Sequence, residues 1–149
     1  MKIALGSDHG GFALKEDIKA YLNGESCEVI DLGTDSEEPV DYPEYALRVA
    51  REVAAEVCDL GILVCGTGIG MSITANKVPG VRAALCNDTF CAEHARRHND
   101  ANVLAIGGRV VEPDDARKIV KIFITTSFDG GRHRRRVDQI MAIEKEWRT

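Results

Sequence analysis

The chain has 149 residues, a hydrophobic fraction of 44%, a charged fraction of 29% and a net charge of −5 at pH 7. This length and composition predict one domain over residues 1–149 that buries a core without disulfides or metals. The acidic balance, with a pI of about 5.4, argues against a general nucleic-acid-binding protein. No apolar run reaches the roughly 18 residues of a membrane span. Because the five cysteines form no C-x-x-C pair and no signal peptide is recognisable, a reduced cytoplasmic location is expected.

Apolar runs alternate along the chain with segments of helical periodicity. This alternation is typical of right-handed βαβ units and of a parallel sheet that carries helices on both faces. The sequence therefore predicts a three-layer α/β/α fold with a five-stranded parallel, Rossmann-like sheet and a C-terminal helix. The predicted strands are 2–5, 28–32, 60–65, 82–86 and 102–106, and the predicted helices are 12–22, 42 to about 57, 71–77, 88–98, 112 to about 126 and 132–147.

A glycine-rich turn, CGTGIG over residues 65–70, stands between the most apolar predicted strand and a helix. This arrangement points backbone N–H groups at an anion. The spacing differs from the dinucleotide fingerprint G-x-G-x-x-G, and the next strand ends at Cys86 and Asn87 without the expected acidic residue. A cradle for a small anion or oxyanion is therefore favoured over a plain tight turn or a dinucleotide site.

Cys65 differs from the other cysteines because it ends its strand at the N-terminus of a helix. The helix dipole and the nearby N–H groups favour a thiolate at this place. A thiolate there can act as a nucleophile or as a base. Cys27, Cys58 and Cys86 are instead expected to be packing residues.

Polar residues follow three of the predicted strands. Asp8 and His9 follow the first strand, residues 65–70 end the third, and Gly107-Gly108-Arg109 ends the fifth. Ligands of open parallel sheets bind outside the carboxyl ends of the strands. The sequence therefore predicts one site that combines these three strand ends.

His94 and His98 lie one helical turn apart, with Cys91 near the same face. The set superficially resembles a metal site. Because no H-E-x-x-H or comparable spacing is present, a metal is disfavoured. His94 is expected to be a surface or packing residue, whereas His98 fits either proton transfer or a simple interaction with the helix dipole.

Arg132 and Arg136 are four residues apart on the predicted last helix, so both project from one face. Two guanidinium groups match the bidentate geometry of a phosphate. A bound anion would also offset their unfavourable place at a helix N-terminus. The alternatives are a solvated basic face and a nucleic-acid patch, and the second is disfavoured because aromatic residues are lacking.

Five segments together resemble the ribose-5-phosphate isomerase B family, whose wider group includes the subunits of galactose-6-phosphate isomerase. The resemblance extends over essentially the whole chain, in order and in spacing. Each motif is weak by itself, and the set is specific. The segments are 6–12 (GSDHGGF), 65–70 (CGTGIG), 75–77 (ANK), 98–102 (HNDAN) and 130–133 (GGRH).

The resemblance implies aldose–ketose isomerisation of D-ribose 5-phosphate and D-ribulose 5-phosphate in the pentose phosphate pathway, with no metal and no organic cofactor. It implies that Cys65 is the base, that Thr67 helps the turn to hold the enediolate and that His98 opens the sugar ring. Some relatives use a glutamate just after the turn, where this chain has Met71, which leaves Cys65 as the base. The implied substrate contacts are Asp8, His9, Gly66, Thr67, Gly68, Ile69, Gly70, Asn99, Arg109, Arg132 and Arg136, with the arginines mainly on the phosphate.

The resemblance also implies a homodimer, or a dimer of dimers, with shared active sites. The charge and the lack of a long apolar run predict no nucleic-acid partner and no membrane partner. Two other functions stay open: a hexose-6-phosphate isomerase acting on allose or galactose 6-phosphate, and a non-catalytic sugar-phosphate-binding module. Comparing turnover of ribose 5-phosphate and allose 6-phosphate separates the two enzymes. A binding module needs no base, so the thiol at the turn counts against it.

Overall fold

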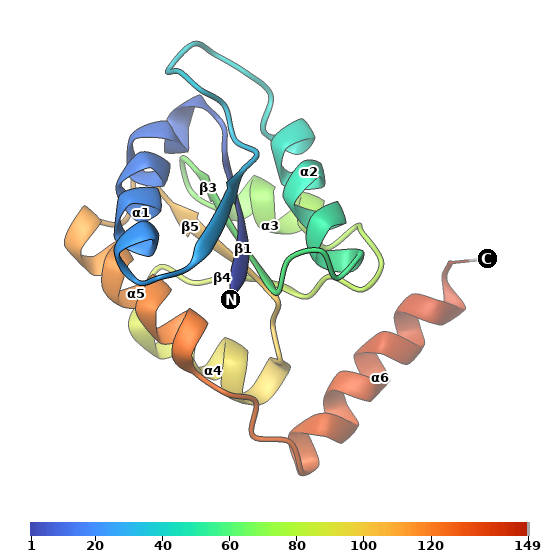
Figure 1. Ribbon diagram of the computed structural model, residues 1–149. Helices are drawn as coiled ribbons and strands as arrows, with labels where there is room; N and C mark the ends of the chain where they lie inside the picture. Colours follow the sequence, from blue (N-terminus) through green and yellow to red (C-terminus); the bar gives the residue numbers. More distant parts are fainter. Residues whose placement is uncertain (149) are drawn as a thin grey trace.

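The computed structural model describes residues 1–148 and shows, within them, a five-stranded sheet and six α-helices. The strand order is β2-β1-β3-β5-β4, and all neighbouring strands are parallel (Figure 1). The predicted α/β fold with a parallel sheet is thus confirmed. No described helix is long and apolar enough to cross a membrane. The elements are β1 (Lys2–Ser7), α1 (Phe12–Gly24), β2 (Glu28–Asp31), α2 (Tyr42–Ala54), β3 (Leu60–Cys65), α3 (Ile69–Ala75), β4 (Ala83–Leu85), α4 (Thr89–Asn99), β5 (Val103–Gly107), α5 (Pro113–Thr125) and α6 (Arg132–Glu146), with a 3₁₀ turn at His9–Gly11.

The central strand β3 is buried along its whole length, between β1 and β5. Its sequence is a continuous apolar run rather than an alternating one, because helices cover both faces of a parallel sheet. Side chains of β1 show the two faces directly. Ile3 and Leu5 join a core with α1, α4 and α5, whereas Ala4 joins a core with α2 and α3 (Figure 1).

The order of the strands reverses between β1 and β3. The chain first adds β2 outside β1 and then places β5 and β4 on the other side of β3. In open parallel sheets such a point forms a crevice at the carboxyl edge, where ligands bind. The loops that follow Ser7 and Cys65 lie at this crevice, which is where the sequence predicts the site.

Helix α6 packs mainly against α4 and projects beyond the other elements (Figure 1). Glu144 accepts a hydrogen bond from the Gly80 amide at 3.0 Å. Three large apolar side chains of this region, Ile140, Ile143 and Trp147, remain exposed. The C-terminal helix therefore presents an apolar surface that this chain does not cover.

The observed element boundaries lie within about two residues of the predicted ones, apart from the end of α2. We expected α2 to reach about residue 57, and it ends at Ala54. The cause is Glu56, whose φ of 58° lies in the left-handed region and cannot continue a right-handed helix.

A buried lysine ties α1 to the loop that follows β2. Lys15 is 1% exposed, and its Nζ donates to both carboxylate oxygens of Asp31 (3.1 and 2.8 Å) and to the carbonyl of Thr34 (2.8 Å). Burial alone would raise the pKa of Asp31, but hydrogen bonds from Lys15, the Gly33 amide and Lys19 hold it below its usual value. These bonds fix the start of the 33–41 loop, whose far end reaches the crevice.

We expect Asp31→Asn to destabilise the fold by about 2–3 kcal/mol, because the buried Lys15 ammonium loses its main countercharge. The stabilisation by Asp31 is present above the unfolded carboxyl pKa and is lost as the pH falls through the lower folded value. Urea unfolding should therefore show a large deficit for this variant near neutral pH and a smaller one in acid. Asp35→Asn, at an exposed carboxylate of the same loop, is the matched control. Equal stability of the two variants at neutral pH would contradict this account.

Candidate functional site

The Cys65 thiol is buried at the end of β3 and faces the first amides of the turn. Its Sγ accepts a hydrogen bond from the Gly68 N–H at 3.2 Å. Gly68 has a φ of +81°, and a Cβ there would lie 2.6 Å from Leu85 and 2.9 Å from the Ile106 carbonyl carbon. Only glycine fits this conformation and this space. The turn therefore holds a backbone N–H donor against the sulfur.

The first turn of α3 begins directly after Gly68. The amides at a helix N-terminus have no intrahelical acceptor. Thr67 Oγ1 accepts from the Ile69 amide at 3.3 Å, so this side chain lies at the same place. Gly70 is packed against the Tyr42 ring, and a Cβ there would lie 2.5 Å from it. The backbone N–H groups at the start of α3 thus lie beside the Cys65 sulfur, in a turn that packs closely against Tyr42.

Backbone hydrogen bonds hold the three predicted strand ends together. The Asp8 amide donates to the Val64 carbonyl at 3.3 Å, and the Gly108 amide donates to the Cys65 carbonyl at 2.7 Å. The Arg109 amide donates to the Gly66 carbonyl at 3.0 Å. These bonds place the segments after β1, β3 and β5 side by side at one edge of the sheet.

The Arg109 guanidinium lies over the glycines of two of these segments. A Cβ on Gly66 would be 3.1 Å from one of its nitrogens, and a Cβ on Gly10 would be 3.4 Å from another. Arg109 is exposed apart from these contacts. It is therefore a cation at the rim of the crevice, available to an anionic ligand.

Asp8 and His9 are oriented by the backbone around them. The buried Asp8 carboxylate accepts from the Gly11 amide at 3.1 Å. His9 Nδ1 accepts from the Val40 amide at 3.1 Å. Because an amide can only donate, Nδ1 carries a lone pair and the ring proton lies on Nε2. His9 thus presents an N–H donor through Nε2. We call Asp8, His9, residues 65–70 and Arg109 the Cys65 cluster.

The other predicted residues gather around the end of α4 and the start of α6. The ring of His98 stacks on the ring of His133, with centroids 4.0 Å apart and planes 8° apart. His98 Nε2 lies 3.9 Å from a carboxylate oxygen of Asp129. Asp129 is held by Arg97, whose Nε donates to it at 3.2 Å. We call His98, Asn99, Asp129, Arg132, His133 and Arg136 the His98 cluster.

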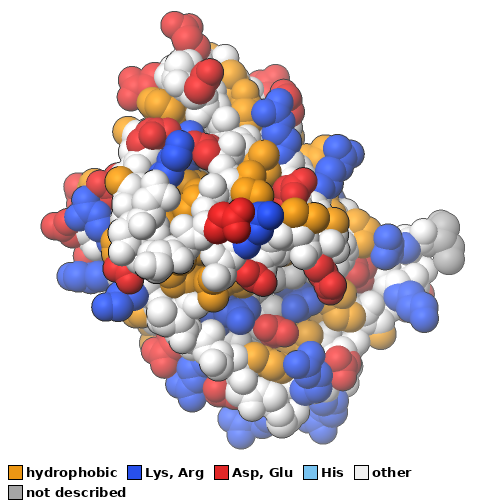
Figure 2. All heavy atoms as spheres, viewed as in Figure 1, with side chains coloured by type: hydrophobic (Ala, Val, Ile, Leu, Met, Phe, Trp, Pro, Cys, Tyr) orange, Lys and Arg blue, Asp and Glu red, His pale blue; other side chains and the backbone are white. Residues whose placement is uncertain are grey.

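Charges around the His98 cluster shift two of its pKa values. Hydrogen bonding to Arg97 lowers the pKa of Asp129, which stays ionised. Burial, followed by the nearby charges of His98 and Arg132, lowers the pKa of His133. The lowered pKa favours the neutral form of the His133 imidazole. Arg132 and Arg136 are exposed, and Figure 2 shows Lys and Arg side chains gathered along this lower edge of the molecule.

Within one chain the two clusters lie at opposite ends of the strands. The Cys65 cluster is at the carboxyl ends, and the His98 cluster is at the amino ends. Cys65 pairs with Gly107 at the carboxyl end of β5. Asn99 ends α4 and leads into Val103 at the amino end of β5. Gly107 lies four residues after Val103 in β5, which is about 13 Å along the strand. One small substrate therefore cannot touch both clusters of the same chain.

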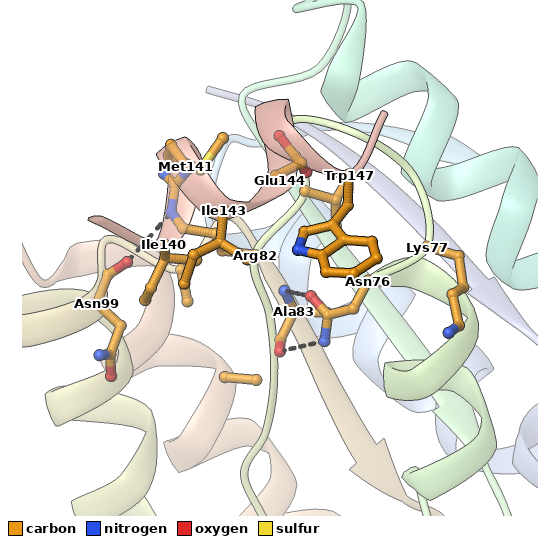
Figure 3. A pocket seen from close by; sticks show the side chains of 13 residues that line it. Asn76, Lys77, Arg82, Ala83, Asn99, Ile140, Met141, Ile143, Glu144 and Trp147 are labelled. Carbon is orange, nitrogen blue, oxygen red and sulfur yellow. Dashed lines mark hydrogen bonds between the residues drawn. The ribbon is translucent and has the colours of Figure 1, made fainter. Parts of the chain in front are cut away.

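A large groove lies between α6 and the segment after α3, on the side of the His98 cluster. Its volume is about 660 Å³. Ile140, Ile143 and Trp147 line one wall, and Asn76 exchanges two hydrogen bonds with Ala83 on the other (Figure 3). The groove does not include Cys65 or the glycine turn.

The structure adds residues that sequence reasoning missed. Asp129 and His133 lie beside His98, and Tyr42 packs against Gly70. His133 stands between residues already singled out, Arg132 and Arg136, so its position was a usable signal. Asp129 and Tyr42 lie in or beside connecting loops, and neither belongs to a sequence motif or a helical pattern that could have indicated a site.

Comparisons with known proteins place the chain among sugar phosphate isomerases. The Ribose/Galactose Isomerase family matches residues 3–140. A putative sugar phosphate isomerase of Bacillus subtilis is 51% identical over 147 residues, covering 98% of this chain and 99% of the relative. Ribose-5-phosphate isomerase B of Escherichia coli is 51% identical over 144 residues, 97% of each chain. The solved structure of ribose-5-phosphate isomerase B from Clostridium thermocellum has a TM-score of 0.97 at 52% identity and covers 99% of each chain.

Gly68→Ala should distort the turn, since an L-residue in the left-handed region costs about 1–2 kcal/mol and the new methyl also overlaps Leu85 and Ile106. We expect a loss of stability in urea unfolding greater than about 2 kcal/mol. Gly24→Ala is the matched control, because nothing lies within 4 Å of a Cβ there. The turn would not be constrained as described if both variants unfolded at the same urea concentration.

Proposed function

Because this chain belongs to the ribose/galactose isomerase family and is an isomerase, we propose that it interconverts D-ribose 5-phosphate and D-ribulose 5-phosphate. The observation that carries the proposal is the Cys65 thiol within 3.2 Å of a backbone N–H at the start of a helix. The relatives named for ribose-5-phosphate isomerase B cover nearly the whole chain, which supports the pentose substrate over a hexose phosphate.

The reaction moves a proton between two neighbouring carbons of an open-chain sugar. In our proposal the Cys65 thiolate removes the proton from C2 of the aldose, which leaves an enediolate. The same sulfur then returns a proton to C1, while a proton moves from O2 to O1. Enolate-type intermediates need donors aimed at the developing oxyanion. The Thr67 hydroxyl and the amides from Gly66 to Gly70 would supply these donors.

The His98 cluster supplies the other half of the proposed chemistry. His98 would pass a proton to the ring oxygen as the furanose opens, while the anomeric hydroxyl at C1 loses its proton to water, which produces the linear aldose. Arg132 and Arg136 would bind the phosphate, with Arg109 as a third cation. Asp8, His9 and Asn99 would hold the hydroxyl groups of the sugar. A thiol base and amide donors suffice for this chemistry, so it needs no cofactor.

Because the two clusters lie at opposite edges of one sheet, we propose that a second copy of the chain completes each site. In a homodimer of this kind, the Cys65 cluster of one chain faces the His98 cluster of the other. Exposed apolar side chains support this arrangement: Ile69 and Ile73 lie on α3, and Leu85 lies on the edge strand β4. The apolar groove beside α6 offers a matching surface. Isologous contacts of this kind are common in homodimers, and two dimers can associate further.

Free thiols support a reducing, cytoplasmic location. All five cysteines, which lie within the described residues, are unpaired. Burial raises the pKa of the Cys86 thiol to about 12, as expected for a packing residue. Cys58 is also buried, whereas Cys27 is only partly so.

We take residues 1–149 as one sugar-phosphate isomerase domain.

Cys65→Ala should abolish proton transfer, so kcat should fall by at least about 10³-fold while KM changes little. Arg136→Ala should act mainly on KM, since it removes a phosphate contact that the bound substrate and the transition state share. Steady-state kinetics with ribose 5-phosphate in metal-free buffer measure both. Cys91→Ser, which removes an exposed thiol, is the control and should retain activity. Isomerase activity that persists unchanged in Cys65→Ala would rule out the thiol as the base.

A further inference from the structure

Three potential metal ligands meet beside the exposed end of α4. His98 comes from the last turn of α4, Asp129 from the connection to α6, and His133 from the first turn of α6. One ligand atom of each residue lies within 4.8 Å of the other two. This set differs from the helical pair His94 and His98 that the spacing suggested. Three segments of the chain therefore bring together two imidazoles and one carboxylate.

We propose that His98, Asp129 and His133 form a binding site for a divalent transition-metal ion of the Zn²⁺ type, and that the bound ion inhibits the enzyme. Two histidines and a carboxylate are a common ligand set for Zn²⁺, with a water in the fourth position. The inhibitory part rests on the proposed function, because the ion would occupy a ring nitrogen of His98, the residue proposed to open the sugar ring. The binding part is independent of that function.

The ligands must close around the ion by a small movement. Donor atoms of tetrahedral Zn²⁺ with bonds of about 2.0–2.1 Å lie about 3.3 Å apart. The longest separation in the cluster, at most 4.8 Å, must therefore shorten by about 1.5 Å. Because stacked rings direct their lone pairs in parallel, one imidazole must also turn out of the stack. The side chains of His98 and Asp129 are each 35% exposed, which leaves room for these rotations.

Charges near the cluster limit the affinity without removing the site. Arg97 pairs with Asp129, but it also donates to Glu93 at 3.1 Å and so keeps a countercharge when Asp129 turns to the ion. Arg132 and Arg136 add positive charge on the same edge. We therefore expect a reversible regulatory site that is weaker than a structural zinc site.

His94 provides a close comparison, because its ring also contacts the ring of His98. Its ring contacts His98 edge-on, with centroids 4.9 Å apart, but its Nδ1 is occupied by the Phe90 carbonyl at 2.8 Å. It does not belong to the three-residue set. A metal bound at the proposed site should therefore not depend on His94.

Titration of the full-length protein with Co²⁺ and with Zn²⁺ tests the binding. The Cys91→Ser background removes the exposed thiol as an adventitious ligand. We expect one ion per chain, with the visible absorption of tetrahedral Co²⁺ and its displacement by Zn²⁺ in calorimetry. Asp129→Asn and His133→Gln should each weaken binding by more than about tenfold, whereas His94→Gln should bind like the parent. Using two ligand variants keeps the test valid if one of them misfolds.

The site would be disproved if no Co²⁺ or Zn²⁺ bound, or if binding survived both Asp129→Asn and His133→Gln. Loss of binding in His94→Gln would also overturn it. The inhibitory role is tested separately, as Zn²⁺ inhibition that EDTA reverses and that weakens in His133→Gln relative to that variant's own zinc-free activity. Zn²⁺ that binds at these ligands without inhibiting would contradict the role proposed for His98, while leaving the site itself in place.

Discussion

The left-handed backbone at Gly68 is the constraint on which the rest of the Cys65 cluster depends. It turns the chain from β3 into α3 so sharply that the Gly68 amide meets the Cys65 sulfur at 3.2 Å. Leu85 and the Ile106 backbone fill the space that a side chain would need. The parallel sheet then adds the ends of β1 and β5 to the same edge. Backbone geometry thereby brings the Cys65 sulfur, the amides of the turn and the cation of Arg109 together.

A second constraint is the direction of the strands. Because all five are parallel, helices that follow strands carry the chain back to the amino edge, and α4 delivers His98 there. Acidic side chains lie over the loop after β2 at the top of Figure 2, and basic ones lie at the opposite edge. The fold thus separates the Cys65 thiol from Arg132 and Arg136. A second chain resolves this separation if the two edges meet in a dimer.

The parallel sheet and the position of the Cys65 cluster could be predicted from the sequence. The alternation of apolar runs and amphipathic segments indicated the parallel sheet, and the rule for strand ends brought Asp8, Cys65 and Arg109 together. The place of His133 between Arg132 and Arg136 could have marked it, but the sequence could not show that it lies beside His98 with Asp129, because those contacts depend on the path of the chain from α5 to α6. Nor could it show that Glu56 would end α2 early, since left-handed φ is uncommon for glutamate.

The sharing of the site between two chains is tested most directly by mixing two variants that each have a very low kcat/KM. One carries Cys65→Ala, and the other carries Arg132→Ala together with Arg136→Ala. Each heterodimer then has one site with all substitutions and one with none. After statistical exchange we predict recovery of about a quarter of the wild-type kcat/KM, because half of the dimers are mixed and each has one intact site. Heterodimers that form, as shown by different affinity tags, but remain inactive would contradict the shared site.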